Sequence, residues 1–262
     1  MIRARRRSLT TGVSRVVGAA ASPLPVWESV LEDTFTGYGA LEAAWNYGYP
    51  WGSDHNGSAQ VNTAADREHV FLEPDGVLAL KATREPAGER RSAHAPHSPI
   101  RYRSGAIHAR EPIVVTDGHP DWEVRGEFRA PAGRGAWPAC WLSGDASLPP
   151  ECDILEFRGD TRNWFTTYRD AAGAASNTVV AVRNPDGWHG YRAWITKVGA
   201  TDVDIHYYLD GTWVGVHRGA NFAGRPMWLI IDLQMEGASG RPGPTASTHF
   251  RARNVYVGRN RT

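Results

Sequence analysis

Three acidic side chains lie close together in one short segment, at Glu151, Asp153 and Glu156. The residues between them and Phe157 are apolar, which predicts a strand with one face in the core rather than a solvated acidic edge strand. On a regular strand Glu151 and Asp153 share a face, whereas Glu156 points the other way. A β-bulge at Ile154-Leu155 would insert one residue and return Glu156 to the face of the other two acids.

Paired carboxyl groups on one surface suit the cleavage of a glycosidic bond. Retaining glycosidases hold two carboxyl groups about 5 to 5.5 Å apart, one to attack the anomeric carbon and one to protonate the leaving oxygen. On the bulged strand the Cα atoms of Glu151 and Glu156 would be roughly 13 Å apart, and converging side chains can close most of that gap. Asp153 between them would hydrogen-bond a glutamate, and its charge would raise a neighbouring carboxyl pKa.

With its approach strand, this segment resembles glycoside hydrolase family 16, the laminarinase and lichenase group. The family pattern E-x-D-x-x-E is present, preceded by G-x-W-P-A-x-W-L at residues 135–142. The resemblance extends over most of the chain and implies a concanavalin-like fold with Glu151 as nucleophile, Asp153 as its assisting carboxylate and Glu156 as acid/base. It also implies that the cleft is lined by Trp137, Trp141, Asn62, Arg103, His189 and Gln234.

The sequence departs from the family pattern at four places. Pro149-Pro150 stiffens the approach to Glu151 and supplies no stacking Trp there. Asp232 replaces the usual Asn, and Met235-Glu236-Gly237 replaces a run of small residues, which could alter substrate choice. Arg253 takes the place of an aspartate that commonly binds calcium, and a cation does not ligate calcium. We therefore expect no metal and no cofactor.

Short alternating or apolar runs separated by Gly, Pro, Asp and Asn predict an antiparallel all-β domain, without helical periodicity. Hairpins are expected around Pro74-Asp75-Gly76 and around Asp210-Gly211. This many strands normally form two packed sheets, so we predict a single-domain β-jelly-roll sandwich. Further strands are expected at 101–109, 122–130, 136–142, 152–158, 164–169, 178–183, 191–198, 227–234 and 249–257.

Two other features bear on the site. The stretch 86–99 is rich in Pro, Arg, Ser, Ala and His, and it predicts a polar loop whose His94 and His97 are solvated rather than metal ligands. Strand parity places Cys140 and Cys152 on the face opposite the acids, inside the sandwich. We predict two buried free thiols, because a bridge between adjacent strands is geometrically demanding.

Composition limits the partners and the compartment. The chain has 262 residues, with 29 Lys plus Arg against 28 Asp plus Glu, so it offers no charged footprint for nucleic acid or an anionic membrane. Its 11 Trp residues suit core packing and stacking on sugar rings. Residues 1–26 are basic and then weakly apolar, which predicts either a twin-arginine export signal or a disordered basic tail before a catalytic domain at 27–262. We expect a secreted monomer that binds a polysaccharide or oligosaccharide.

Taken together, the sequence predicts a retaining endo-glycosidase that acts by double displacement. The substrate implied by the resemblance is β-1,3-glucan or mixed-linkage β-1,3-1,4-glucan, with a galactan as the runner-up. Transfer of the glycosyl unit to another sugar instead of water stays open. A non-catalytic carbohydrate-binding sandwich is disfavoured, because such a module has no use for paired acids on a bulged strand.

Overall fold

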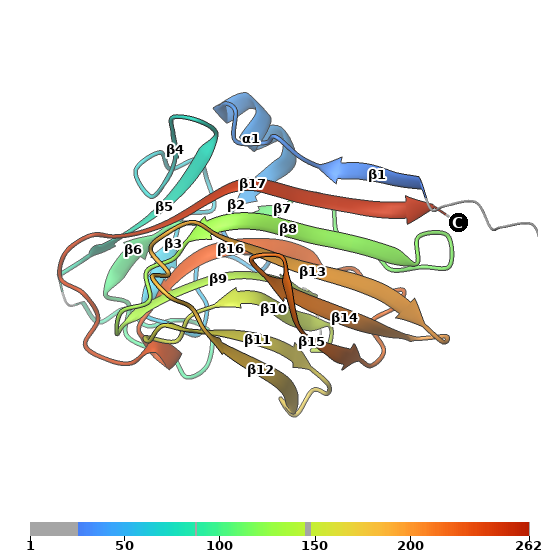
Figure 1. Ribbon diagram of the computed structural model, residues 1–262. Coiled ribbons are helices and arrows are strands. Elements are labelled where there is room, and N and C mark those ends of the chain that lie inside the picture. The colour runs from blue at the N-terminus through green and yellow to red at the C-terminus, as the bar shows by residue number, and fades with distance from the viewer. Residues whose placement is uncertain (1–25, 87, 145–147, 262) are drawn as a thin grey trace, which may run out of the picture.

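The computed structural model describes residues 26–86, 88–144 and 148–261 (Figure 1). The predicted export signal or basic tail therefore lies almost entirely outside the described residues. Within them, strands dominate, and there is one short helix, α1 (Tyr38–Ala44), and one 3-10 turn, η1 (Gly237–Ser239). The sequence shows no helical periodicity at α1, because this seven-residue element is too short to show a helical repeat.

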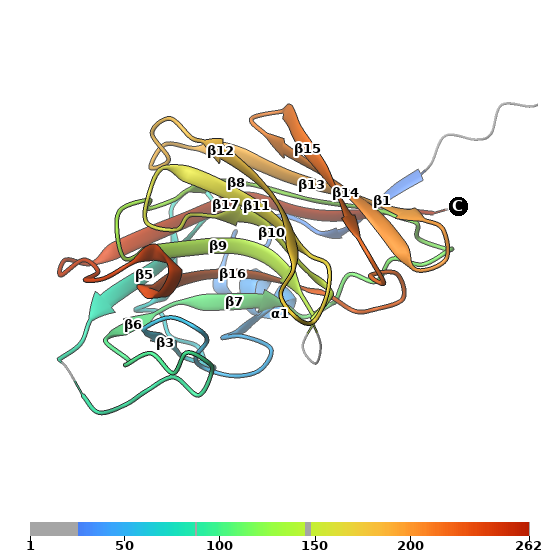
Figure 2. The ribbon, with the colours of Figure 1, turned by 90° about the horizontal axis from the view of Figure 1, so that it is seen from below.

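The strands form two sheets that pack face to face (Figures 1 and 2), which confirms the predicted all-β sandwich. The ten-stranded sheet contains β15 (Thr212–Gly219), β14 (Asp202–Leu209), β13 (His189–Val198), β8 (Asp121–Arg129), β17 (Thr248–Arg261), β5 (Val77–Arg84), β6 (Tyr102–Ser104) and β3 (Ala59–Val61), with β1 (Val26–Leu31) on β17 and β4 (Val70–Glu73) on β5. The seven-stranded sheet contains β12 (Ala175–Ala181), β11 (Arg162–Tyr168), β10 (Glu151–Glu156), β9 (Ala136–Ser143), β16 (Trp228–Met235), β7 (Ala106–Ala109) and β2 (Trp45–Tyr47).

Both predicted hairpins are present. β4 pairs with β5 on either side of the Pro74-Asp75-Gly76 turn, and β14 pairs with β15 across Asp210-Gly211. In the second hairpin Asp210 and Gly211 have φ angles of 49° and 75°, the left-handed conformation that a two-residue turn of this kind needs. Pairing is antiparallel throughout the named strands except between β3 and β6, which run parallel.

The core between the sheets is built from the inward faces of both. Its largest fully buried side chains include Trp45, Trp122 and Tyr207. Cys140 and Cys152 belong to this core, are 2% and 0% exposed, and are free thiols, as predicted. Since both cysteines point inward, the alternate residues of β9 and β10 point outward, away from the ten-stranded sheet.

A β-bulge interrupts the catalytic candidate strand where the sequence predicts it. Asp153 lies opposite Trp141 of β9 and Leu155 lies opposite Cys140, so Ile154 is an extra residue on β10. The inserted residue restores Glu156 to the outward face, opposite Ala139. Among the described residues, no helix is long and apolar enough to cross a membrane.

Candidate active site

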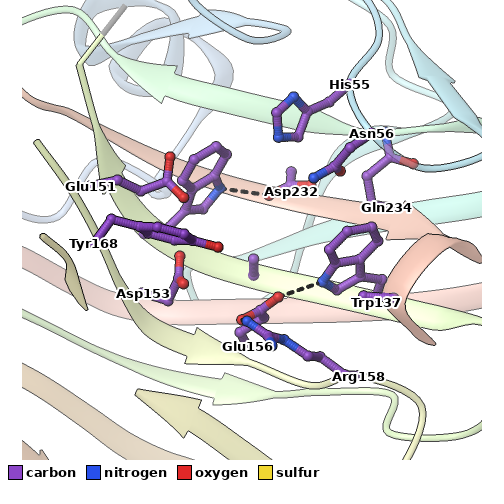
Figure 3. A pocket seen from close by; sticks show the side chains of 13 residues that line it. His55, Asn56, Trp137, Glu151, Asp153, Glu156, Arg158, Tyr168, Asp232 and Gln234 are labelled. Atoms are coloured by element: carbon purple, nitrogen blue, oxygen red, sulfur yellow. Dashed lines mark hydrogen bonds and ion pairs between the residues drawn. The ribbon is translucent and has the colours of Figure 1, made fainter. Parts of the chain in front are cut away.

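A pocket of about 250 Å³ opens on the outward face of the seven-stranded sheet. Figure 2 shows β10, β9, β16 and β7 side by side across this part of the molecule. The first three of these strands supply most of the lining, and the rest comes from flanking loops and from β11. The lining residues are His55, Asn56, Trp137, Ala139, Trp141, Glu151, Asp153, Glu156, Arg158, Tyr168, Asp232, Gln234 and Ala238 (Figure 3).

The three acids of β10 all line this pocket, as their predicted parity requires (Figure 3). Burial, reinforced by the charge of Glu156, raises the pKa of Glu151 to about 7, although the Ser143 hydroxyl donates a 3.4 Å hydrogen bond to it. Burial and the two neighbouring glutamates raise the pKa of Asp153 well above its usual range. Desolvation and like charge therefore favour a protonated carboxyl at both positions.

Glu156 is held by donors on both of its oxygens. The indole Nε1 of Trp137 donates to Oε1 at 2.7 Å, and Nη2 of Arg158 donates to Oε2 at 2.7 Å. The Arg158 guanidinium in turn lies 4.5 Å from the ring centroid of Trp164. Asn163 fixes the backbone at the bulge, since its amide oxygen accepts from the Glu156 N–H at 2.9 Å. Charge-assisted bonds of this kind orient a carboxylate firmly.

A fourth carboxyl group, Asp232, lies on β16 beside the catalytic candidates. It accepts hydrogen bonds from the Tyr49 hydroxyl at 2.8 Å and from the Trp141 indole at 2.9 Å. Burial raises its pKa to about 7. This residue, which departs from the family pattern, fixes the orientation of Trp141 at the pocket.

Gln234 also lines the pocket, as predicted, but its amide is used inside the protein. Its oxygen accepts from the Ala59 N–H at 3.0 Å, and its nitrogen donates to the Ala59 carbonyl at 3.1 Å and to the Tyr49 hydroxyl at 3.3 Å. Gln234 thus ties β3 to β16 and supports the loop that precedes β3.

The structure does not bring Asn62, Arg103 or His189 to this pocket, and each has a local partner elsewhere. The Asn62 amide donates to Asp66 at 2.7 Å, and Arg103 bonds Glu85 and Gln60, each at 2.8 Å. His189 lies on β13 of the other sheet, with Nδ1 2.8 Å from the Asp210 carboxyl. In this protein these three polar side chains join neighbouring segments of the chain and do not line the pocket.

Several pocket residues carry no signal in the sequence. Arg158 lies just beyond β10 and Tyr168 is the last residue of β11, while His55 and Asn56 lie in a loop without periodicity. His94, predicted to be solvated, is half-buried, and its ring centroid lies 5.8 Å from that of His55, so this prediction was wrong. His97 is exposed, as predicted. In the described part of the chain no group of three or more His, Cys, Asp or Glu is arranged to hold a metal ion.

No family model matches the chain. Individual known proteins nevertheless identify its family. Its fold is similar to that of an endo-1,3-β-glucanase from Streptomyces sioyaensis (18% identity, TM-score 0.65, 93% of this chain and 100% of that one) and of a non-specific endo-β-1,3(4)-glucanase from family 16 (19%, TM-score 0.65, 90% and 92%). In sequence it is 36% identical over 242 residues to a galactan endo-β-1,3-galactanase of Flammulina velutipes, covering 92% of this chain and 95% of that protein. The chain belongs to glycoside hydrolase family 16.

As a family 16 member, the protein is an O-glycosyl hydrolase. A second relative, the endo-1,3-1,4-β-glycanase EglC of Rhizobium meliloti, is 29% identical over 178 residues, which is 66% of this chain and 35% of that protein. The family 16 resemblance seen in the sequence is thus confirmed.

Proposed function

We propose that this family 16 enzyme is a retaining endo-glycosidase that hydrolyses the backbone of a β-1,3-linked hexose polysaccharide, with Glu151 and Glu156 as its reacting groups. The observation that supports this most directly is the bulge at Ile154, which places both glutamates and Asp153 in one pocket. A carbohydrate-binding module would gain nothing from a buried cluster of acids whose charges oppose one another.

The reaction proceeds in two displacements. In the first, the Glu151 carboxylate attacks the anomeric carbon, the glycosidic C–O bond breaks, and the Glu156 carboxyl gives its proton to the leaving oxygen. In the second, the Glu156 carboxylate takes a proton from water, whose oxygen displaces Glu151 from the anomeric carbon. Two inversions give net retention, and the enzyme regains its starting protonation.

The electrostatics of the pocket fit a pair of glutamates that shares one proton. Because the charge of Glu156 helps to raise the pKa of Glu151, a proton on Glu156 favours the ionised, nucleophilic form of Glu151. The first displacement needs the proton on Glu156 and the charge on Glu151, which is the reverse of the distribution that the raised pKa of Glu151 favours in the free enzyme. Trp137 and Arg158 orient Glu156, and Asp153 lies between the two glutamates on β10.

Two polymers are candidates for the substrate. β-Glucan is the substrate expected from the sequence, and it is supported by relatives such as EglC and a β-glucanase of Rhodothermus marinus that is 32% identical over 58% of this chain. β-1,3-Galactan is supported by the relative that aligns over nearly the whole chain. A solved structure of the same fold was co-crystallised with a β-glucan oligosaccharide and presents 1,3-β-D-cellobiosyl-glucose at its active site.

A panel of β-1,3-galactan, β-1,3-glucan and mixed-linkage glucan, with product analysis, tests the proposal. We expect a fall in viscosity ahead of reducing-end release, and proton NMR should show the β-anomer before mutarotation. With a substrate that has a good leaving group, Glu156→Ala should be rescued by azide and yield a β-glycosyl azide. First appearance of the α-anomer would overturn the mechanism, and transfer products in place of hydrolysis would make the enzyme a transglycosylase.

A further inference from the structure

One pocket wall outside the sheet is the loop from Trp51 to Asn56. It carries three buried polar atoms without a hydrogen-bond partner among the described residues: Nε1 of Trp51, Nδ1 of His55 and Oδ1 of Asn56. Figure 3 shows His55 and Asn56 extending into the pocket from the side opposite Asp153 and Glu156. Buried polar atoms normally have partners, so a group of three beside a catalytic pocket indicates that a ligand completes them.

This wall is fixed before any ligand arrives. The backbones of Tyr49 and Gly52 exchange hydrogen bonds of 3.0 and 3.2 Å at the start of the loop. At its end the Ser58 N–H donates to the Met235 carbonyl of β16 at 2.7 Å. Gly57 packs so closely on β16 that a Cβ there would lie 2.2 Å from Oε1 of Gln234, so only glycine fits.

The carbonyl of His55 is held as well, because the Ser92 hydroxyl of the 86–99 segment donates to it. The polar atoms of the wall therefore do not need to be ordered when a substrate binds, which lowers the entropic cost of using them.

The ring of His55 is also fixed. Its centroid lies 5.6 Å from that of Trp141, nearly stacked at 28°, and 5.1 Å from that of Trp51. Burial, followed by the charge of His94, lowers the pKa of His55 to about 4, so the ring is neutral near pH 7. Asp54 is the carboxylate that opposes this shift. A neutral imidazole offers one N–H donor and one nitrogen acceptor, which matches a hydroxyl group.

We infer that His55 is a substrate-binding residue that hydrogen-bonds a sugar hydroxyl and favours a galacto-configured backbone over a gluco-configured one. This inference rests on the proposed function. A galactosyl ring differs from a glucosyl ring only in its axial O4, which gives it one apolar face and one polar side. The pocket has the matching asymmetry, since Trp137 and Tyr168 supply rings while His55 and Asn56 supply free polar atoms.

Two substitutions at His55 separate a hydrogen bond from a packing role. His55→Phe keeps a flat ring against Trp141 but removes both nitrogens, whereas His55→Asn removes the ring but keeps a polar atom near the position of Nδ1. His94→Phe is the matched control, because His94 touches the ring of His55 without lining the pocket. Thermal unfolding of each variant establishes whether it is folded.

The readout is kcat/KM on β-1,3-galactan and on β-1,3-glucan. We expect the native enzyme to prefer galactan. His55→Phe should lose about tenfold on galactan, the equivalent of one substrate hydrogen bond, and much less on glucan. His55→Asn should keep more of the galactan preference than His55→Phe, and His94→Phe should leave the preference unchanged.

The outcomes distinguish this inference from the proposed function. If the native enzyme cleaves a polymer of the panel but the galactan-to-glucan ratio is the same in His55→Phe, or glucan is preferred, the inference is wrong and the proposed function stands. A lower galactan preference in His55→Asn than in His55→Phe would show that the ring, not its nitrogen, matters. Activity on none of the polymers would overturn both.

Discussion

At the scale of single residues, the pocket contains three carboxyl groups that are hard to ionise and one that accepts hydrogen bonds from two N–H donors. Glu151, Asp153 and Asp232 have pKa values raised by burial, whereas Glu156 bonds both Trp137 and Arg158. In the free enzyme the raised pKa of Glu151 favours a proton on that residue, whereas the first displacement needs the proton on Glu156. The two reacting groups are therefore not interchangeable.

Substitutions of the acids should follow their roles. Glu151→Gln and Glu156→Gln should each lose at least roughly a hundredfold in kcat on a polysaccharide while still folding and binding oligosaccharide. Asp153→Asn should cost less than Glu151→Gln, because it supports the nucleophile without forming the covalent bond. Steady-state kinetics and calorimetric binding check this. Near-native turnover of either glutamine variant would mean that the site is misassigned.

The acids could be predicted from the sequence because their spacing, the apolar residues between them and strand parity leave one consistent arrangement. Strand parity put Trp137 and Trp141 on one face, and the family resemblance implied that they and Gln234 line the cleft. His55 could not be predicted, since its position depends on where an irregular loop folds back. Residue type alone does not determine that.

At the scale of elements, the regular strands were predictable and the short ones were not. Long alternating runs such as β13 and β14 carry the period-2 signal, whereas β2 and β3 have three residues each. The parallel pairing of β3 with β6 joins segments far apart in the chain, and no local pattern encodes it. Yet β3 anchors the loop that bears His55, so the least predictable element supports the least predictable part of the site.

Gln234 is the side chain that joins β3 to β16, and its removal should be costly. Gln234→Ala leaves four hydrogen bonds unmade and should lower the free energy of unfolding by about 2 to 4 kcal/mol. Urea unfolding measures this. Gln234→Met fills the same volume without polar atoms, so full stability in that variant would show that packing, not hydrogen bonding, is what Gln234 supplies.

The two cysteines lie on adjacent strands but are not facing partners. Cys152 lies opposite Leu142, and Cys140 lies opposite Leu155. Burial raises the pKa of both thiols, which disfavours the reactive thiolate. We expect a thiol reagent to react with no cysteine in the folded protein and with both cysteines after denaturation without reductant. A count of zero in denaturant would indicate a disulfide.

At the scale of the whole molecule, aromatic residues serve several purposes. Trp137 and Trp141 line the pocket of the seven-stranded sheet. Other rings lie under arginines, with Arg253 4.2 Å from the Trp188 centroid and Arg192 4.6 Å from that of Tyr208. An abundance of Trp therefore does not by itself locate a sugar-binding surface.

Burial of acids in the pocket should make the stability of the whole fold depend on pH. The pKa of Glu151 rises from 4.5 to about 7 on folding, and that of Asp232 from 3.8 to about 7. Between the unfolded and folded pKa values of these two groups, the folded state binds more protons than the unfolded state. Their contribution to the free energy of unfolding is therefore fully present below about pH 4 and is lost as the pH rises through 7. Each pKa unit corresponds to about 1.4 kcal/mol.

Glu151→Gln removes one of these ionisations. Its unfolding free energy should exceed that of the native protein more at pH 8 than at pH 5, by an amount on the order of 1 to 3 kcal/mol. Denaturant unfolding at both pH values measures the difference, and Glu89→Gln at an exposed position is the control. If the unfolding free energy of Glu151→Gln and of the native protein depended on pH in the same way, the raised pKa of Glu151 would be contradicted.

The bond between Trp137 and Glu156 has a spectroscopic consequence. The indole N–H donates directly to the carboxyl that handles the proton, and the ring borders the pocket. Indole emission responds to hydrogen bonding and to the polarity of its surroundings, so Trp137 is a built-in fluorophore at the reacting atoms. A spectrum of the native enzyme minus that of Trp137→Phe would isolate its signal from the other ten tryptophans. That difference signal would report oligosaccharide binding and the charge state of Glu156 without a label.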